Sequence, residues 1–215
     1  MKKNFKMSLA VVLMSSTLLV ACNKNNSSHS TNHASSKENH TKVEQNIAAK
    51  TEEKSQDVAL SDWSGEWNNI ANFIDDDALK GAYDEVAKRD NITAEQAKQN
   101  FADRTAVDFG AIKVDDDSIT FFSKPGGEEL EKANFKYVDK HPMEHGGKTL
   151  YWYEFSSDGK YPTILMMPVH GEEHMPHFHL RVGESAEEML AKDNWYPTFV
   201  SPTVTIDQVY EEVAE

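Results

Sequence analysis

The sequence predicts an α+β domain, mainly β, in which a small antiparallel barrel is flanked by N- and C-terminal helices. Short stretches of alternating apolar and polar residues, separated by turn residues, fill the middle of the chain from about residue 106 to 182. Helical patterns with capping residues precede and follow these stretches, and grouped strands with grouped helices are typical of α+β folds. The chain has 215 residues, and we expect one domain over residues 58–215.

The expected helices begin at residues suited to cap a helix. Ser61 can cap a first helix, whose apolar stripe would be Trp63, Trp67, Ile70 and Ile74. A second helix is expected over 77–89. Capping boxes, in which Ser or Thr is followed three residues later by an acid or amide, predict the remaining helices, over 93–102, over 185–192 and from Thr205 onward.

The expected strands are short and are connected by clear turns. They span 106–114, 118–122, 134–138, 148–155, 161–167 and 177–182. Three consecutive aspartates at 115–117 would turn the chain between the first two, and Asp158-Gly159 is a favourable hairpin turn. Such closely spaced strands favour antiparallel pairing within a barrel.

The first 22 residues are typical of a secretion signal. Lysines at positions 2, 3 and 6 precede an apolar stretch, Met7 to Val20, that is short for a membrane-spanning helix. The stretch ends in Leu19-Val20-Ala21-Cys22, which resembles a bacterial lipobox. We therefore expect a signal peptide over 1–21 and a lipid-modified Cys22, which would anchor the protein on the extracytoplasmic face of a bacterial cell membrane.

Residues 22–57 form an expected disordered linker, rich in His, Asn, Ser and Lys, because they hold too few large apolar side chains to form a core. His29, His33 and His40 within it are either polar filler or a weak metal-gathering tract. The chain has 22 basic and 36 acidic residues, of which eight basic and five acidic precede residue 58, so the domain carries a net charge of −17. This charge argues against nucleic-acid binding. A single cysteine excludes an intramolecular disulfide and a cysteine-based zinc site.

Four histidines lie within ten residues, in His170-Gly-Glu-Glu-His174-Met-Pro-His177-Phe-His179. Alternate residues of a strand point to the same face, so His177 and His179 would present their rings side by side. If the connection before them folds back as a hairpin, His170 approaches the pair. Three neutral imidazoles are a good zinc site with an open fourth position, so we expect His170, His177 and His179 to bind zinc.

Other residues near this window have alternative explanations. Met166, Met167 and Met175 would suit Cu(I), although methionine is more often core filler. Glu172 and Glu173 would complete a coordination shell or lie in a solvated turn. His141 and His145, beside Pro142 and Gly146-Gly147, are expected to face solvent in a loop.

Three segments resemble the ZinT (YodA) family, and the resemblance covers roughly residues 60–213. They are Leu60-Ser-Asp-Trp-Ser-Gly-Glu-Trp67, His177-Phe-His179 and Asn194-Trp-Tyr-Pro-Thr198. The resemblance implies a lipocalin-like (calycin) barrel that binds zinc or cadmium through an upstream histidine and both members of the H-F-H pair. The family usually places Ser-Asp-His about nine residues before the pair, whereas Pro168-Val169-His170 lies seven before it. His174 is therefore the competitor of His170 as third ligand.

The resemblance favours a binding protein, not an enzyme, that scavenges zinc and delivers it to an ABC-type zinc uptake system or its solute-binding protein. One alternative is a zinc enzyme of hydration or hydrolysis type, for which Glu172, Glu173 and Tyr153 are the candidate acids or bases. The other is a metal-independent barrel that binds a small ligand or a surface partner. On any of these hypotheses the membrane is contacted through the lipid anchor alone.

Overall fold

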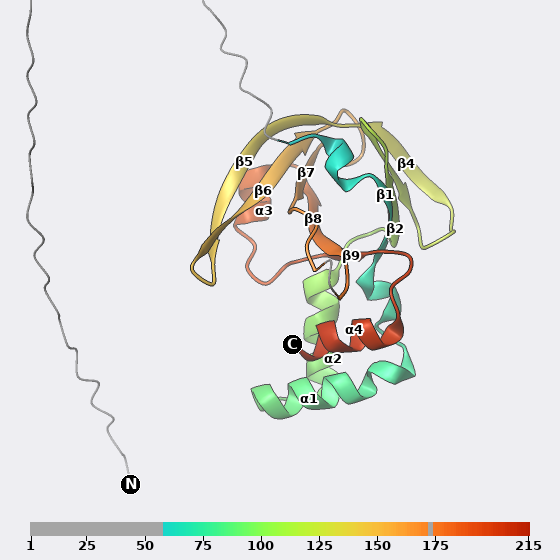
Figure 1. Ribbon diagram of the computed structural model, residues 1–215, viewed down its shortest axis with the longest axis vertical. Helices are drawn as coiled ribbons and strands as arrows, with labels where there is room; N and C mark the ends of the chain where they lie inside the picture. Colours follow the sequence, from blue (N-terminus) through green and yellow to red (C-terminus); the bar gives the residue numbers. More distant parts are fainter. Residues whose placement is uncertain (1–57, 172–173) are drawn as a thin grey trace, which may run out of the picture. The chain divides into compact units, whose positions relative to one another are not determined.

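The computed structural model describes residues 58–171 and 174–215. The strands among them build one antiparallel sheet that curls into a half-barrel (Figure 1). Its strands are β1 (Gly65–Asn69), β2 (Ala111–Val114), β3 (Ser118–Phe122), β4 (Glu129–Asn134), β5 (Lys136–His145), β6 (Lys148–Ser156), β7 (Thr163–Met166), β8 (His177–Gly183) and β9 (Thr198–Val200). They pair in the order β4-β3-β2-β1-β9-β8-β7-β6-β5. The prediction of a mainly β, antiparallel domain is confirmed in this form.

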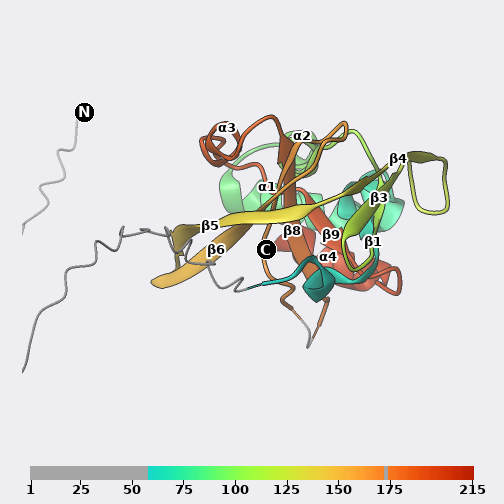
Figure 2. The same cartoon turned by 90° about the horizontal axis from the view of Figure 1, so that it is seen from above.

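Phe135 alone separates β4 from β5, which form the two ends of the sheet. The chain therefore pairs with β3 over β4, bends, and then pairs with β6 over β5. Figure 2 shows β5 and β6 running together along one side of the domain. This bend brings the ends of the sheet toward each other and gives it its curl.

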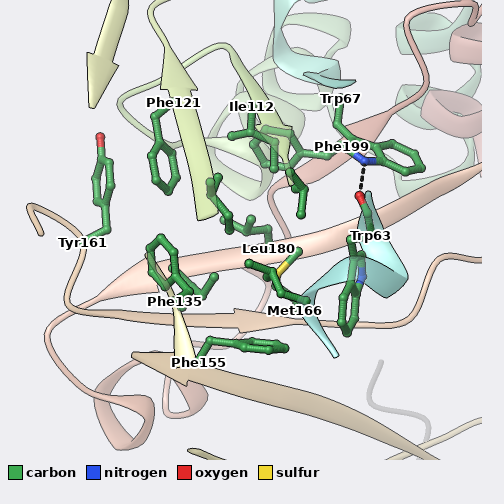
Figure 3. Close-up of a cluster of buried hydrophobic side chains, with 14 of the residues drawn as sticks. Trp63, Trp67, Ile112, Phe121, Phe135, Phe155, Tyr161, Met166, Leu180 and Phe199 are labelled. Carbon is green, nitrogen blue, oxygen red and sulfur yellow. Dashed lines mark hydrogen bonds between the residues drawn. The ribbon is translucent and has the colours of Figure 1, made fainter. Parts of the chain in front are cut away.

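The inner face of the curl holds the largest apolar cluster (Figure 3). Phe178 and Leu180 of β8 have no exposed surface and belong to it, which places the intervening residues of β8 on the opposite face. Phe121, Phe155 and many other aromatic rings fill the remainder of this cluster. Burial of this surface from several strands fixes the register of β8 and with it the orientation of the histidines.

The helices are α1 (Lys80–Asp90), α2 (Ala94–Thr105), α3 (Ala186–Leu190) and α4 (Ile206–Ala214). Thr93 and Thr205 form the predicted capping boxes with Gln96 and Gln208, and the Ser185 hydroxyl accepts from the Glu188 amide. Helices α1, α2 and α4 gather below the sheet in Figure 1, whereas α3 lies apart from them. A second apolar cluster joins these three helices to Val200 of β9 and to Met175.

The prediction of a helix capped by Ser61, with Trp63 and Trp67 on one stripe, is wrong. The chain forms short 3-10 turns at Leu60–Trp63 and Ile70–Phe73, with strand β1 between them. Gly65 has φ +133, a conformation that other residues rarely adopt, and it turns the chain out of the first helical turn. Trp63 and Trp67 are both buried, and the Trp67 indole donates to the Trp63 carbonyl at 2.8 Å (Figure 3).

The prediction that His141 and His145 lie in a loop is also wrong, because both belong to β5, which pairs with β6 along its length. His141 Nε2 lies 2.7 Å from Glu154 Oε2 across the two strands. His145 is exposed at the end of β5, as predicted. The expected signal peptide, Cys22 and linker lie outside the described residues. Within the described part of the chain, no helix is long and apolar enough to cross a membrane.

Candidate metal centre

The histidine window forms the tight hairpin that brings its first and last members together. His170 and His177 face each other in an isolated antiparallel bridge, and each backbone N–H donates to the other's carbonyl at 2.9 Å. Gly171 begins the turn with φ +74, and a side chain there would meet the Met175 carbonyl at 2.5 Å and the His177 Nδ1 at 3.0 Å. Glycine at position 171 therefore lets the sequence before β8 fold back without this strain and crowding.

His170, His177 and His179 form a cluster in which one nitrogen of each ring lies within 4.8 Å of the others. His177 and His179 project from the same face of β8, since Phe178 between them is buried in the core. The ring of His170 lies 4.0 Å from that of His177 and 5.4 Å from that of His179 between centroids. His177 is buried, His179 is half-buried and His170 is exposed, so the cluster opens on one side.

Hydrogen bonds fix which ring nitrogen carries the proton. His170 Nδ1 lies 3.0 Å from the Pro168 carbonyl, and His177 Nδ1 lies 2.8 Å from the Met175 carbonyl. A carbonyl only accepts, so both Nδ1 atoms are protonated in the neutral rings. Nε2 of each ring therefore keeps the lone pair that a metal needs.

The third ring is fixed by a threonine. Thr198 lies directly opposite His179 in the pairing of β8 with β9, and its Oγ1 is 3.1 Å from His179 Nδ1. The same hydroxyl donates to the Tyr196 carbonyl at 2.9 Å, so it accepts from His179 Nδ1–H. His179 thus has the same tautomer as the other two rings.

Burial keeps His179 neutral. Loss of solvent, followed by the neighbouring His170 and His177 and the charges of Arg104 and Arg181, lowers the pKa of His179 from 6.5 to about 3. An imidazole binds a metal only in its neutral form, so this ring requires no deprotonation near neutral pH.

The donor set fits zinc. Zn–N bonds of about 2.1 Å in a tetrahedral site place two ligand nitrogens about 3.4 Å apart. Ligand nitrogens that already lie within 4.8 Å need shifts of about an ångström, which small side-chain rotations supply. Three neutral imidazoles would hold the ion and leave its fourth position open on the side of His170. A bound zinc ion supplies a Lewis acid at that position.

The remaining candidate residues have other places. His174 is exposed, and its carbonyl accepts from the side chain of Gln208; it does not belong to the three-histidine cluster. Met166 and Met175 are buried in separate apolar clusters, as expected of core residues. Tyr153 packs edge-on against Trp63 with centroids 6.0 Å apart. Glu172 and Glu173 lie outside the described residues.

Several residues around the cluster were missed by the sequence analysis. A cavity of about 710 Å³ beside it is lined by Arg104, Met143, His145, Leu150, Met167, Pro168, His170, His179, Asn194, Tyr196, Thr198 and Glu212. Thr198 falls within the Asn194–Thr198 segment that marked the family resemblance, but its bond to His179 depends on a strand, β9, that was not predicted. Arg104 and Glu212 come from helices, and their sequence spacing gives no signal of this role.

Arg181 lies on the histidine face of β8 but is buried, 2 % exposed, and not directed to solvent. Its Nε donates to the Trp195 carbonyl and its Nη1 to the Met189 carbonyl, at 2.8 and 2.7 Å. The guanidinium also lies over the rings of Trp152 and Tyr196, at 4.6 and 4.9 Å. Arg181 therefore holds the segment that leads to Thr198 against β8.

The sequence matches, over residues 39–215, the family described as ZinT (YodA) periplasmic lipocalin-like zinc-recruitment. The chain belongs to the ZinT family. The expected membership is thus confirmed, and the three histidines lie together in a ZinT domain.

Similar proteins have related descriptions. The zinc-binding lipoprotein AdcA of Streptococcus pneumoniae strain R6 is 24% identical over 171 residues, which are 74% of this chain and 32% of AdcA. The chain thus spans about a third of that relative. The probable metal-binding protein YrpE of Bacillus subtilis is 25% identical over 67% of this chain and 59% of its own length.

Solved structures share the fold. The Zn(II)-bound ZinT-like domain of Streptococcus pneumoniae AdcA superposes with a TM-score of 0.58 at 22% identity, over 74% of this chain and 92% of that domain. Zn(II)-bound AdcA itself gives a TM-score of 0.60 at 23% identity, over 73% of this chain and 35% of AdcA. The half-barrel is thus the fold of a ZinT-like domain.

Proposed function

We propose that this protein binds zinc through His170, His177 and His179. The observation that carries the proposal is the convergence of three imidazoles whose hydrogen bonds all leave Nε2 as the ligand atom. The zinc-binding descriptions of ZinT relatives support this choice of metal. Cadmium, which also suits nitrogen ligands, is a second ion that the same cluster would hold.

We further propose that the protein scavenges zinc outside the cytoplasm and delivers it to an uptake system. A carrier must release its ion, and the exposed position of His170 leaves the site open to a receiving protein. The net charge of −17 over residues 58–215 attracts cations to the domain. The relative AdcA is a zinc-binding lipoprotein, which supports anchoring of this chain through Cys22 and delivery to an ABC-type transporter or its solute-binding protein.

The proposal is a binding protein rather than an enzyme. Of the acids and bases considered for a zinc enzyme, Tyr153 packs against the indole of Trp63, which also contacts Phe155. A general acid or base must come within hydrogen-bond reach of the reacting group. The described residues that line the cavity with the histidines include one carboxylate, Glu212, whose pKa is raised by burial.

A zinc titration by calorimetry tests the proposal. The full-length protein should bind one zinc ion, and His177→Ala/His179→Ala should abolish this binding. His174→Ala is the matched control, because His174 is exposed in the same hairpin but lies outside the cluster, so its loss should leave affinity unchanged. Zinc binding that survives the double variant would refute the assignment of the site. Absence of binding to the unmodified protein would favour a metal-independent barrel.

A further inference from the structure

The cavity beside the histidines is larger than a zinc ion with a water molecule requires. Its volume of about 710 Å³ lies within the range of about 300–1,000 Å³ that is typical of pockets for small organic ligands. His170, His179 and Thr198 line it on the metal side. Met143, Leu150, Met167 and Pro168 add apolar surface to its lining. The cavity therefore suits a ligand that has an apolar part and reaches the metal.

Arg104 supplies a positive charge to the same cavity. The Tyr196 amide donates to the Arg104 carbonyl at 2.8 Å, which holds the end of α2 beside the segment before β9. Within the described part of the chain, no carboxylate lies within ion-pair distance of its guanidinium, which rests 5.3 Å from the ring centre of Phe101. Arg104 lines the cavity together with His179 and Glu212, and its charge lowers the pKa of His179 and opposes the rise in the pKa of Glu212.

Zinc binding would leave this region with an excess of positive charge. Three neutral imidazoles do not reduce the charge of the zinc ion, and Arg104 adds a second positive charge to the cavity. Arg181 adds a third on the histidine face of β8, where backbone carbonyls accept its hydrogen bonds. Among the lining residues that the structure describes, Glu212 is the one carboxylate, and burial, reinforced by Glu215, raises its pKa. Positive charges gathered around a cavity attract a partner of opposite sign, and here the half-buried Arg104 and the open face of the cavity can receive one from solution.

We propose that the cavity binds a small organic carboxylate, which takes the fourth position on zinc and is held by Arg104, so that the protein captures zinc as a zinc–carboxylate complex. The inference rests on the proposed zinc site and adds the chemical class of its second ligand. A carboxylate offers two oxygens, one for the metal and one for the guanidinium, and its carbon chain covers the apolar part of the lining. Inorganic anions such as chloride provide no such chain.

The test uses full-length protein loaded with cobalt(II), whose visible spectrum reports the ligands of the metal. Titration with butyrate at constant ionic strength should give a saturable spectral change, and the same concentrations of chloride should give none. Arg104→Gln should weaken the butyrate affinity by about ten- to a hundredfold, because it removes a charge-assisted hydrogen bond. Arg104→Lys should restore part of the loss, and zinc binding without butyrate should remain in both variants.

Two results would overturn the proposal while leaving the zinc site intact. One is a cobalt spectrum that does not respond to butyrate, or responds equally in Arg104→Gln. The other is a spectrum that already shows a carboxylate ligand before butyrate is added and loses it in Glu212→Gln, because the fourth ligand would then come from the chain itself. Failure of the protein to bind cobalt or zinc at all would instead refute the proposed function.

Discussion

Thr198→Val tests whether the hydrogen bond behind His179 prepares that ring for zinc. Valine has nearly the shape of threonine, so the substitution removes the hydroxyl with little change in packing. Thr198 is buried, 4 % exposed, and its hydroxyl both accepts from His179 Nδ1 at 3.1 Å and donates to the Tyr196 carbonyl at 2.9 Å. Without it, the buried Nδ1–H has no acceptor, and the tautomer with the proton on Nε2 becomes favourable.

The magnitude follows from this switch of tautomer. An unsatisfied buried donor costs about 1–3 kcal/mol, and zinc binding would require either that cost or a proton transfer back to Nδ1. Loss of such a partner behind a metal-binding histidine typically lowers metal affinity about 10- to 100-fold, equivalent to about 1.4–2.7 kcal/mol. We expect a loss of zinc affinity in this range at pH 7.5 in chloride buffer.

Competition for zinc with a chromophoric chelator measures the effect, and two comparisons isolate its cause. Thr198→Ser retains the hydroxyl and should stay close to the unmodified protein. Thermal unfolding of the metal-free variants shows whether a loss of affinity follows from loss of the fold. A zinc affinity of Thr198→Val within about twofold of the unmodified protein would refute the claim that this bond sets the tautomer of His179.

Three further outcomes are expected. Gly171→Ala should lower zinc affinity about tenfold or more, because its side chain would meet the Met175 carbonyl and the left-handed backbone would cost about 1–2 kcal/mol. Gly146→Ala is the control, since Gly146 also has a positive φ, +57, but a side chain there would meet open space, so zinc affinity should be unchanged. Equal zinc affinities of the two variants in chelator competition would contradict this. The pKa of His179 is about 3 in the folded protein and about 6.5 in the unfolded chain, so the unfolded state binds more protons as the pH falls below 6.5. The free energy of unfolding of the metal-free protein, measured in urea, should therefore fall by about 2 kcal/mol between pH 7.5 and pH 5. His179→Gln should be spared that part of the loss, and an equal loss in both proteins would count against the assigned neutral ring. Cys22→Ala should leave the fold intact by circular dichroism and move the protein to the soluble fraction of cells, and continued membrane association would exclude the lipid anchor.

The sequence predicts the parts of the fold that depend on local chemistry. The capping boxes at Thr93 and Thr205 identify α2 and α4, because their reciprocal bonds involve residues three apart. The same holds for the alternation in β8, which places Phe178 in the core and the two histidines on the other face.

The incorrect predictions arise where tertiary contacts decide the structure. Trp63 and Trp67 are spaced as on a helix, but a positive φ at Gly65 and pairing with β2 place Trp67 on a strand. The outer strand β5 is more polar than apolar, and its residues alternate between exposed and half-buried rather than fully buried, so the pattern that would identify it is weak. Arg104 reaches the candidate site from α2, and only the folded chain shows this.

The three candidate ligands are unequal in how firmly the fold holds them, and this has a kinetic consequence. His177 and His179 belong to a strand paired on both sides, whereas His170 is exposed beyond the end of β7. We expect a receiving protein to replace His170 first, so that zinc passes through a state shared between donor and acceptor and is never free in solution. The rate of transfer to a strong chelator should then rise with chelator concentration, whereas transfer by simple dissociation would proceed at a constant rate.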